Sequence, residues 1–322
     1  MNPSLDLGPG AEFDRIRSIL RRLGDRAAGV GGDCALIPFG DGLLAVSVDL
    51  SIEGTHFRRQ WLSLEEIGWR AAAGALSDLA AAGAEAIGIL ASVGVPRGAP
   101  AEDAESLMEG VGAAAASVGG VVLGGDLAAA PSWLVDVTVL GRVTRAVTRG
   151  GTRPGDGVWV SGALGSARAA LDAFLRDATP AADVRPAFAR PQPRLAVGQA
   201  LARLGVTAMI DLSDGLGGDA AHLAAASQCE IAIDLEAVPI GPGVAEEAGR
   251  CSVPPAVYAA RGGEDYELLF TLPGSLAAEE VAAVATVTGV PLTRIGWVRG
   301  GRGVRLRLGG RDQEVRGFDH FA

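Results

Sequence analysis

Apolar and polar positions follow two alternating periods along this chain. Residues 12–23, 64–82, 101–118, 195–204 and 276–287 place apolar side chains at the three- and four-residue spacing of a helix face. Shorter apolar or alternating runs, which are typical of strands, cover residues 34–39, 43–48, 86–93, 121–123, 133–143, 158–161, 208–210, 230–235, 267–272, 294–298 and 304–308. Because helices and strands alternate in both halves, the pattern predicts an α/β or mixed α+β fold.

A change in composition divides the chain near its middle. Residues 144–156 are rich in Arg, Gly and Thr. The full length of 322 residues is enough for two domains of ordinary size. We therefore predict an N-terminal domain over residues 1–147 and a C-terminal α/β domain over residues 148–322. The Pro-rich stretch 179–193 inside the second domain is expected to be irregular.

The charge balance excludes several classes of function. A net charge of −10 argues against nucleic acid as the main partner. A phosphorylated substrate would also be repelled, unless metal ions or local arginines offset the negative field. The sequence contains no lysine, so all 28 basic residues are arginine. This excludes the P-loop lysine, the strand lysine of protein kinases and lysine Schiff bases.

The composition favours a cytoplasmic protein. The longest membrane-like run, residues 110–125, is short and rich in Gly and Ala. No basic segment followed by an apolar one marks the N-terminus as a secretion signal. The three cysteines, Cys34, Cys229 and Cys251, are odd in number and far apart, so neither a disulfide framework nor a zinc site is expected.

The most informative stretch is residues 208–219, which read AMIDLSDGLGGD. A short apolar strand ends here in Asp211 and Asp214, directly before a helical pattern. Two like charges this close repel each other unless a cation lies between them. Oxygen ligands favour Mg²⁺, Mn²⁺ or Ca²⁺ over zinc. On this motif alone, a helix-capping aspartate beside a solvated one explains the sequence equally well.

The same arrangement recurs along the chain. Six aspartates lie at the end of a predicted strand, beside glycine or, for one of them, inside an apolar helix face: Asp33, Asp49, Asp78, Asp126, Asp211 and Asp214. The helical one is Asp78, where an unpaired charge is costly. If the six converge, their repulsion requires two or more cations, and such clusters suit phosphate chemistry. Any single one of them is more typical of a turn or a cap than of a metal site.

Glycines and histidines add weaker signals. The pairs Gly124-Gly125 and Gly262-Gly263 each precede an acidic residue, which suits phosphate contact or simply a tight turn. Residues 162–165 lack the third glycine of a dinucleotide fingerprint. The three histidines have no metal-ligand spacing, and His56, near Asp49, is the best candidate for a substrate contact.

Taken together, these motifs resemble the thiamine-monophosphate kinase family, within the superfamily of aminoimidazole ribonucleotide synthetase. The matching segments occur in the family's order and cover nearly the whole chain: residues 31–36 (GGDCAL), 48–57 (VDLSIEGTHF), 76–84 (LSDLAAAGA), 124–126 (GGD), 153–156 (RPGD), 209–216 (MIDLSDGL), 262–270 (GGEDYELLF) and 318–321 (FDHF). The resemblance implies an N-terminal synthetase-like domain, whose small sheet pairs with that of a second subunit in a homodimer. It also implies a C-terminal domain that closes the active site.

The resemblance further implies ATP, several Mg²⁺ ions and thiamine monophosphate as ligands. Carried over by position, the metal ligands would be Asp33, Ser47, Val48 through its backbone, Asp49, Asp78, Asp126, Asp211 and Asp214. The nucleotide would meet Gly125, Asp126, Arg149 and Ser213, and thiamine monophosphate would meet His56, Glu264 and Phe318.

Three positions depart from the family pattern. Gly32-Asp33 stands where many members have two acids, and Leu127-Ala128 stands where threonines are usual. The aromatic residue that many members place near the adenine is not evident around residues 101–107.

The implied reaction is ATP-dependent phosphorylation of thiamine monophosphate to thiamine diphosphate by direct, Mg²⁺-assisted phosphoryl transfer. The attacking phosphate is largely ionised at neutral pH, so no residue is expected to act as a general base. Two alternatives remain: another ATP-dependent enzyme of the same superfamily, or a non-catalytic nucleotide-binding module. Turnover of ATP would separate the module from either enzyme.

Overall fold

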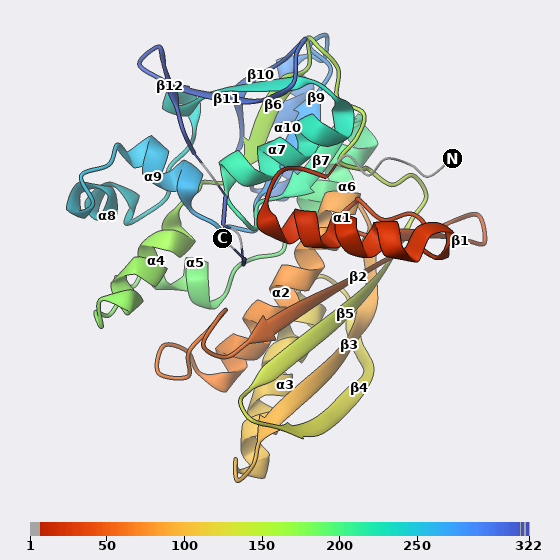
Figure 1. Cartoon of the computed structure of the whole chain (residues 1–322), viewed down its shortest axis with the longest axis vertical. Coiled ribbons are helices and arrows are strands. Elements are labelled where there is room, and N and C mark those ends of the chain that lie inside the picture. Colours follow the sequence, from red (N-terminus) through yellow and green to blue (C-terminus); the bar gives the residue numbers. More distant parts are fainter. Residues whose placement is uncertain (1–6, 316, 319, 322) are drawn as a thin grey trace.

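Two β-sheets, one built from each half of the chain, organise the molecule (Figure 1). The computed structural model describes residues 7–315, 317–318 and 320–321, so Asp319 of the terminal motif lies outside the described residues. The first sheet ends at Val143 and the second begins at Gly157, and the predicted boundary at 147–148 lies between them. The alternating pattern of the sequence therefore folds as a mixed α/β protein with two sheets, as predicted.

The N-terminal sheet has the strand order β1-β2-β5-β3-β4. Its strands are β1 (Ala35–Phe39), β2 (Gly42–Ile52), β3 (Glu85–Pro96), β4 (Val121–Ala130) and β5 (Leu134–Val143). Only the β3–β4 pair is parallel; the other three pairs are antiparallel. The helices α2 (Leu64–Ala82) and α3 (Ala101–Ser117) cover one face (Figure 1).

The opposite face of this sheet is left open and carries apolar side chains. Ile89 on β3 faces the helices and is fully buried, whereas its neighbour Leu90 points the other way and is 40% exposed. Leu50 on β2, Phe39 on β1 and Leu123 on β4 are exposed as well. A contiguous apolar surface of this kind is typical of an interaction site rather than of a solvated sheet face.

Helix α2 is the central element of the fold. Its start is fixed by a capping box, in which the Ser63 side chain accepts from the backbone N–H of Glu66 and the Glu66 side chain accepts in return. Along its length only Glu65, Glu66 and Asp78 are not buried. The many Ala and Gly residues of α2 let neighbouring helices approach closely: a methyl group at Gly68 would overlap the backbone carbonyl of Leu107 on α3.

The C-terminal sheet has the strand order β12-β11-β8-β10-β6-β9-β7. Its strands are β6 (Gly157–Ser161), β7 (Ala208–Asp211), β8 (Glu230–Asp234), β9 (Leu268–Leu272), β10 (Leu292–Arg299), β11 (Gly303–Leu308) and β12 (Arg311–Gln313). The helices of this half are α4 (Ser166–Leu175), α5 (Arg185–Ala189), α6 (Leu195–Leu204), α7 (Leu216–Ser227), α8 (Val244–Arg250), α9 (Pro255–Arg261) and α10 (Ala278–Thr288). Strand β7 packs against α2, which brings the two halves together at the acidic end of β7.

Helix α1 (Ala11–Leu23) lies apart from both sheets, and none of its residues is buried. It crosses in front of the junction between the two halves (Figure 1). Among the described residues, no helix combines the length and the apolar character that crossing a membrane requires.

The structure corrects several details of the predicted elements. Asp49 lies inside β2, which continues to Ile52, and not at the end of a strand. The strand predicted over residues 121–123 is longer than expected: β4 continues through the glycine pair to Ala130. It is an exposed edge strand and is not buried. Gly125 lies so close to β3 that a methyl group there would overlap the carbonyl of Ala91, so the pair serves strand pairing here. The stretch 179–193 is not wholly irregular, because it contains α5.

Candidate active site

A cleft between the two halves holds most of the residues that the sequence analysis singled out. It encloses a cavity of about 540 Å³. One wall comes from β2 and α2, and the other comes from the loop after β7, the loop before β9 and the C-terminal tail. The expected site residues that line it are Val48, Asp49, His56, Asp78, Asp211, Ser213, Asp214, Glu264 and Phe318.

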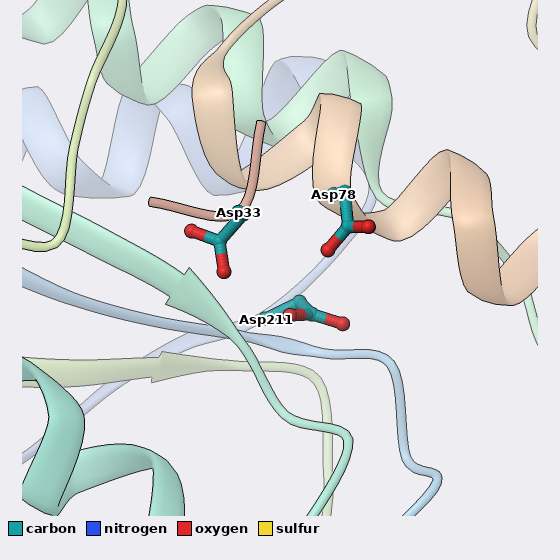
Figure 2. A group of neighbouring side chains, drawn as sticks. All are labelled: Asp33, Asp78 and Asp211. Carbon is teal, nitrogen blue, oxygen red and sulfur yellow. The ribbon is translucent and has the colours of Figure 1, made fainter. Parts of the chain in front are cut away.

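Three carboxylates lie close together (Figure 2), and two of them, Asp78 and Asp211, line the inner end of the cleft. Asp33 comes from the glycine-rich loop before β1, Asp78 from α2 and Asp211 from the end of β7. One oxygen atom from each lies within 4.8 Å of the others. Segments that are far apart in the sequence therefore converge here, as the sequence analysis predicted for these three aspartates.

Neighbouring side chains orient two of the three carboxylates. The Ser47 hydroxyl donates a hydrogen bond to Oδ2 of Asp78 over 2.6 Å. Arg149 donates from Nε and Nη2 to Oδ1 of Asp33, at 3.0 and 2.6 Å. Ser47 thus lies next to a proposed metal ligand, while Arg149 pairs with Asp33 rather than facing the large cavity.

Burial makes these charges costly. It raises the pKa of Asp78 well above its ordinary value, and the nearby charges of Asp211 and Asp33 raise it further. Burial, followed by the charge of Asp33, raises the pKa of Asp211 to about 7. Arg149 offsets only part of the negative charge of these oxygen ligands, and such an arrangement fits a hard divalent cation such as Mg²⁺.

Two further aspartates extend the acidic surface. Asp49 on β2 points toward α2 at Gly74, and burial raises the pKa of its carboxyl group. Asp214 lies in the loop between β7 and α7, which Asp219 holds in place. Oδ2 of Asp219 accepts hydrogen bonds from the backbone N–H groups of Asp214 and Gly215, at 3.3 and 3.1 Å.

Aromatic rings gather at the outer end of the cleft. The rings of His56 and His320 lie 5.1 Å apart, and those of Phe318 and His320 lie 4.9 Å apart. Nδ1 of His56 accepts a hydrogen bond from the backbone N–H of Ile52 over 3.0 Å. The backbone N–H of Phe318 donates to the carbonyl of Asp214 over 2.9 Å, which ties the tail to the acidic loop.

Not every expected residue reaches this cleft. Gly125 and Asp126 lie on the exposed edge strand β4 and do not line the cavity in the single chain. Arg149 and Asp33 border a second, smaller cavity of about 250 Å³ behind the glycine-rich loop. The residues expected around the nucleotide are therefore spread over three places.

Among the cleft-lining residues that the sequence analysis did not single out are Arg70, Tyr266 and His320. Arg70 could have been found from the sequence, because it is a charged residue within the apolar helical pattern of residues 67–82, and the same feature marked Asp78. Tyr266 stood inside the GGEDY motif and His320 inside the FDHF motif, so both lay in segments that already matched the family.

Two family models match this chain, one in each half. Residues 31–143 match the model of the AIR synthase related protein, N-terminal domain. Residues 153–309 match the model of the AIR synthase related protein, C-terminal domain.

Individual relatives match over nearly the full length. The thiamine-monophosphate kinase of Mycobacterium tuberculosis (strain CDC 1551 / Oshkosh) is 34% identical, over 86% of this chain and 84% of the relative. That of Escherichia coli (strain K12) is also 34% identical, over 96% of each chain. A solved structure of AaThiL complexed with AMPPCP and TMP superposes with a TM-score of 0.86 at 31% identity, covering 97% of each chain.

Proposed function

The chain belongs to the thiamine-monophosphate kinase family, and on that premise we propose that it uses ATP to phosphorylate thiamine monophosphate, giving thiamine diphosphate. The observation that carries this proposal is the pairing of two surfaces in one cleft. A cluster of carboxylates lies at the inner end, and aromatic rings with a carboxylate lie at the outer end. A phosphate group and a flat cationic ring system are the two parts of the acceptor, and each suits one end.

The acidic end is proposed to hold Mg²⁺. Asp33, Asp78 and Asp211 would bind it, with Asp49 and Asp214 on the adjoining walls. When bound, Mg²⁺ supplies neutralisation of phosphate charge and polarisation of the transferring phosphoryl group. The protein prepares this place by orienting its ligands, through Ser47 on Asp78 and Arg149 on Asp33.

The reaction needs no general base from the protein, because the acceptor phosphate is largely ionised at neutral pH. His56 agrees with this. Its burial, together with the nearby His320, lowers the pKa of the imidazole, so the ring is neutral near pH 7. Because Nδ1 accepts from Ile52, the one ring proton is on Nε2, and no free ring lone pair is left to act as a base. The same hydrogen bond fixes the ring toward the acceptor. His56, Glu264 and Phe318 would then bind and orient the acceptor, and catalysis would rest on positioning.

A homodimer is part of the proposal. The open apolar face of the N-terminal sheet suits a second copy of the same sheet, because that would bury Leu50, Leu90 and their neighbours. Strand β4 borders this face, so Gly125 and Asp126 are proposed to join the nucleotide site in the dimer and not in the single chain. Arg149 and Ser213 are proposed to contact the nucleotide from the C-terminal half.

A direct assay tests the proposal. The protein is incubated with ATP and Mg²⁺, with thiamine monophosphate, with unphosphorylated thiamine or with neither, and ADP and thiamine diphosphate are quantified. Equal amounts of ADP and thiamine diphosphate are expected only with thiamine monophosphate, and a chelator should abolish both. ADP release that does not depend on the acceptor would point to another ATP-dependent reaction. Nucleotide binding without any turnover would point to a binding module.

A further inference from the structure

Arg70 is a buried cation on the wall of the cleft, at a point where three parts of the chain meet. It lies on α2 and is only 4% exposed. Its Nη1 donates to the backbone carbonyl of Phe188 on α5 over 2.7 Å, and its guanidinium lies 3.9 Å from the centre of the Phe188 ring. Its Nη2 forms an ion pair with Glu264, in the loop before β9. One side chain thus joins both halves of the molecule.

The loop that carries Glu264 has an unusual backbone. Glu264 and Tyr266 both adopt positive φ angles, of 65° and 50°, which side chains other than glycine rarely adopt. Such conformations persist where the surroundings hold them in place. Here the backbone N–H of Glu264 donates to the carbonyl of Ser213 over 2.7 Å, and that of Tyr266 donates to Leu212 over 2.9 Å. Asp265 in turn accepts from the backbone N–H of Gly165 at 3.0 Å.

The face of α2 that carries Arg70 is shaped to receive this loop. Gly74 lies one turn after Arg70, on the same side of the helix. A methyl group at Gly74 would lie 2.9 Å from Oδ2 of Asp49 and 3.2 Å from the Tyr266 hydroxyl. Glycine therefore leaves room for the tyrosine and the carboxylate side by side, while Arg70 holds the neighbouring Glu264.

The gain in folding stability is a poor explanation for the ion pair between Arg70 and Glu264. Taking two charges out of water costs about as much as their attraction returns, so a buried pair is weak evidence of a stabilising role. The charge of Arg70 is nevertheless maintained: burial opposes it, but the facing Glu264, with Tyr266 next, raises the pKa of the guanidinium overall. What this contact does fix is the place of a carboxylate on the wall of the substrate cleft.

We propose that Arg70 is a positioning residue, which holds Glu264 and the loop 262–267 in the conformation that receives the acceptor. The identity of that acceptor rests on the proposed function, whereas the effect of Arg70 on the loop does not. A lysine at this position would keep the charge but lose the planar fork that contacts Phe188 and Glu264 together.

Arg70→Lys is the test, with Arg185→Lys as its matched control. Arg185 also joins α5 to α2, through a two-pronged ion pair with Glu66, but it does not line the cleft. We expect Arg70→Lys to raise the KM for thiamine monophosphate on the order of tenfold, because a charged hydrogen-bonded contact is lost, and to leave the KM for ATP within about twofold. Arg185→Lys should change neither KM. Similar KM values in both variants would overturn the proposal.

A double-mutant cycle with Glu264→Gln shows whether Arg70 acts through Glu264. If it does, adding Arg70→Lys to Glu264→Gln should raise the acceptor KM by less than about twofold beyond the single variant. Fully additive effects would overturn the inferred route.

Hydrogen exchange without any ligand separates this inference from the proposed function. Arg70→Lys and Glu264→Gln each break the same pair, so both should speed exchange in residues 262–267, whereas Arg185→Lys should not. If thiamine monophosphate is not turned over at all, the proposed function fails and this measurement still decides the role of Arg70. If the unmodified protein turns over thiamine monophosphate, but loop exchange and the KM for thiamine monophosphate are unchanged in Arg70→Lys and in Glu264→Gln, only the proposed role of Arg70 fails.

Discussion

At the scale of single residues, the cleft concentrates carboxylates that the surrounding protein neutralises only in part. Asp33 has an arginine partner. Asp78 and Asp211 are held close to Asp33 by the fold, and burial raises the pKa of both carboxyl groups. A cation relieves this cost, and removing one carboxylate should weaken its binding.

Asp214→Asn tests the metal assignment, because it keeps the size of the side chain and removes its charge. Folding should survive, while Mg²⁺-dependent turnover falls by on the order of 10²-fold. Steady-state kinetics over a range of Mg²⁺ concentrations measures this. Asp234→Asn is the control, since Asp234 caps a short helical turn away from the cleft and asparagine can do the same. Near-normal turnover of Asp214→Asn at saturating Mg²⁺ would remove Asp214 from the site.

The raised pKa values also predict how stability depends on pH. Burial, followed by the charge of Asp33, raises the pKa of Asp211 from 3.8 to about 7 in the folded state without metal, so the folded state holds the extra proton between these values. This contribution to stability is fully present below pH 4 and is lost as pH rises through 7. Bound Mg²⁺ replaces the proton, so it should raise the Tm more at pH 8 than at pH 5. Thermal unfolding with Mg²⁺ and with chelator measures this, and Asp211→Asn should flatten the difference. An equal rise at both pH values would contradict it.

Phe318→Ala tests the acceptor end. Phe318 is 60% exposed beside the imidazole of His320, so it contributes little to the core. Loss of the ring should raise the KM for thiamine monophosphate by a factor equivalent to roughly 1–2 kcal/mol and leave the KM for ATP nearly unchanged. Trp297→Ala, at an exposed aromatic on β10, serves as control. If Phe318 only pins the tail, the Tm falls and both KM values move together.

At the scale of elements, α2 and α3 are joined by glycines that face each other's backbone. A methyl group at Gly110 of α3 would overlap the carbonyl of Glu65, just as one at Gly68 would overlap that of Leu107. This close approach lets α2 lie deep enough to hold Asp78 at the cleft.

A matched pair of substitutions on α3 tests this packing. Gly110→Ala should destabilise the protein by several kcal/mol, because overlap with backbone forces the helices apart. Gly112→Ala, where a methyl group would meet only Val122 at 3.9 Å, should be neutral or stabilising by up to about 1 kcal/mol through helix propensity. Urea unfolding of both variants measures the difference. Equal effects would show that the helix contact tolerates expansion.

Sequence patterns predict long helices with several turns of regular apolar spacing, and they miss short elements. The bounds 64–82 for α2 are confirmed, because its apolar pattern is long and its cap is explicit. The helices α8 and α9 escaped notice, since seven residues cannot establish a period. The convergence of Asp33, Asp78 and Asp211 was predictable from their shared local context, but the pairing of Arg149 with Asp33 was not, since no pattern in the sequence marks Arg149 as the partner of an aspartate.

At the scale of the whole molecule, the open sheet face is the feature that a single chain leaves unexplained. The expectation that strands 34–39, 43–48 and 133–143 belong to a homodimer interface stays a prediction. Edge strand β4 adds unpaired backbone groups to this surface, which favours association.

Light scattering at micromolar concentration tests the dimer. The unmodified chain should have twice the monomer mass, and Leu90→Arg, which places a charge on the open face, should be monomeric and nearly inactive. Val287→Arg, at an 84% exposed position on α10, should stay dimeric and active. A stable monomer with full activity would rule the interface out.

The burial of α2 on every side also bears on how the chain can be divided. Its flanks pack on the N-terminal sheet, on α3, on α6 and on β7, so each half of the protein supplies part of its covering. A fragment cut near residue 147 would keep α2 but lose the covering from α6 and β7, and its Ala-rich flank would be left in water. We therefore expect the two family segments to fold together as one cooperative unit and not as independent modules.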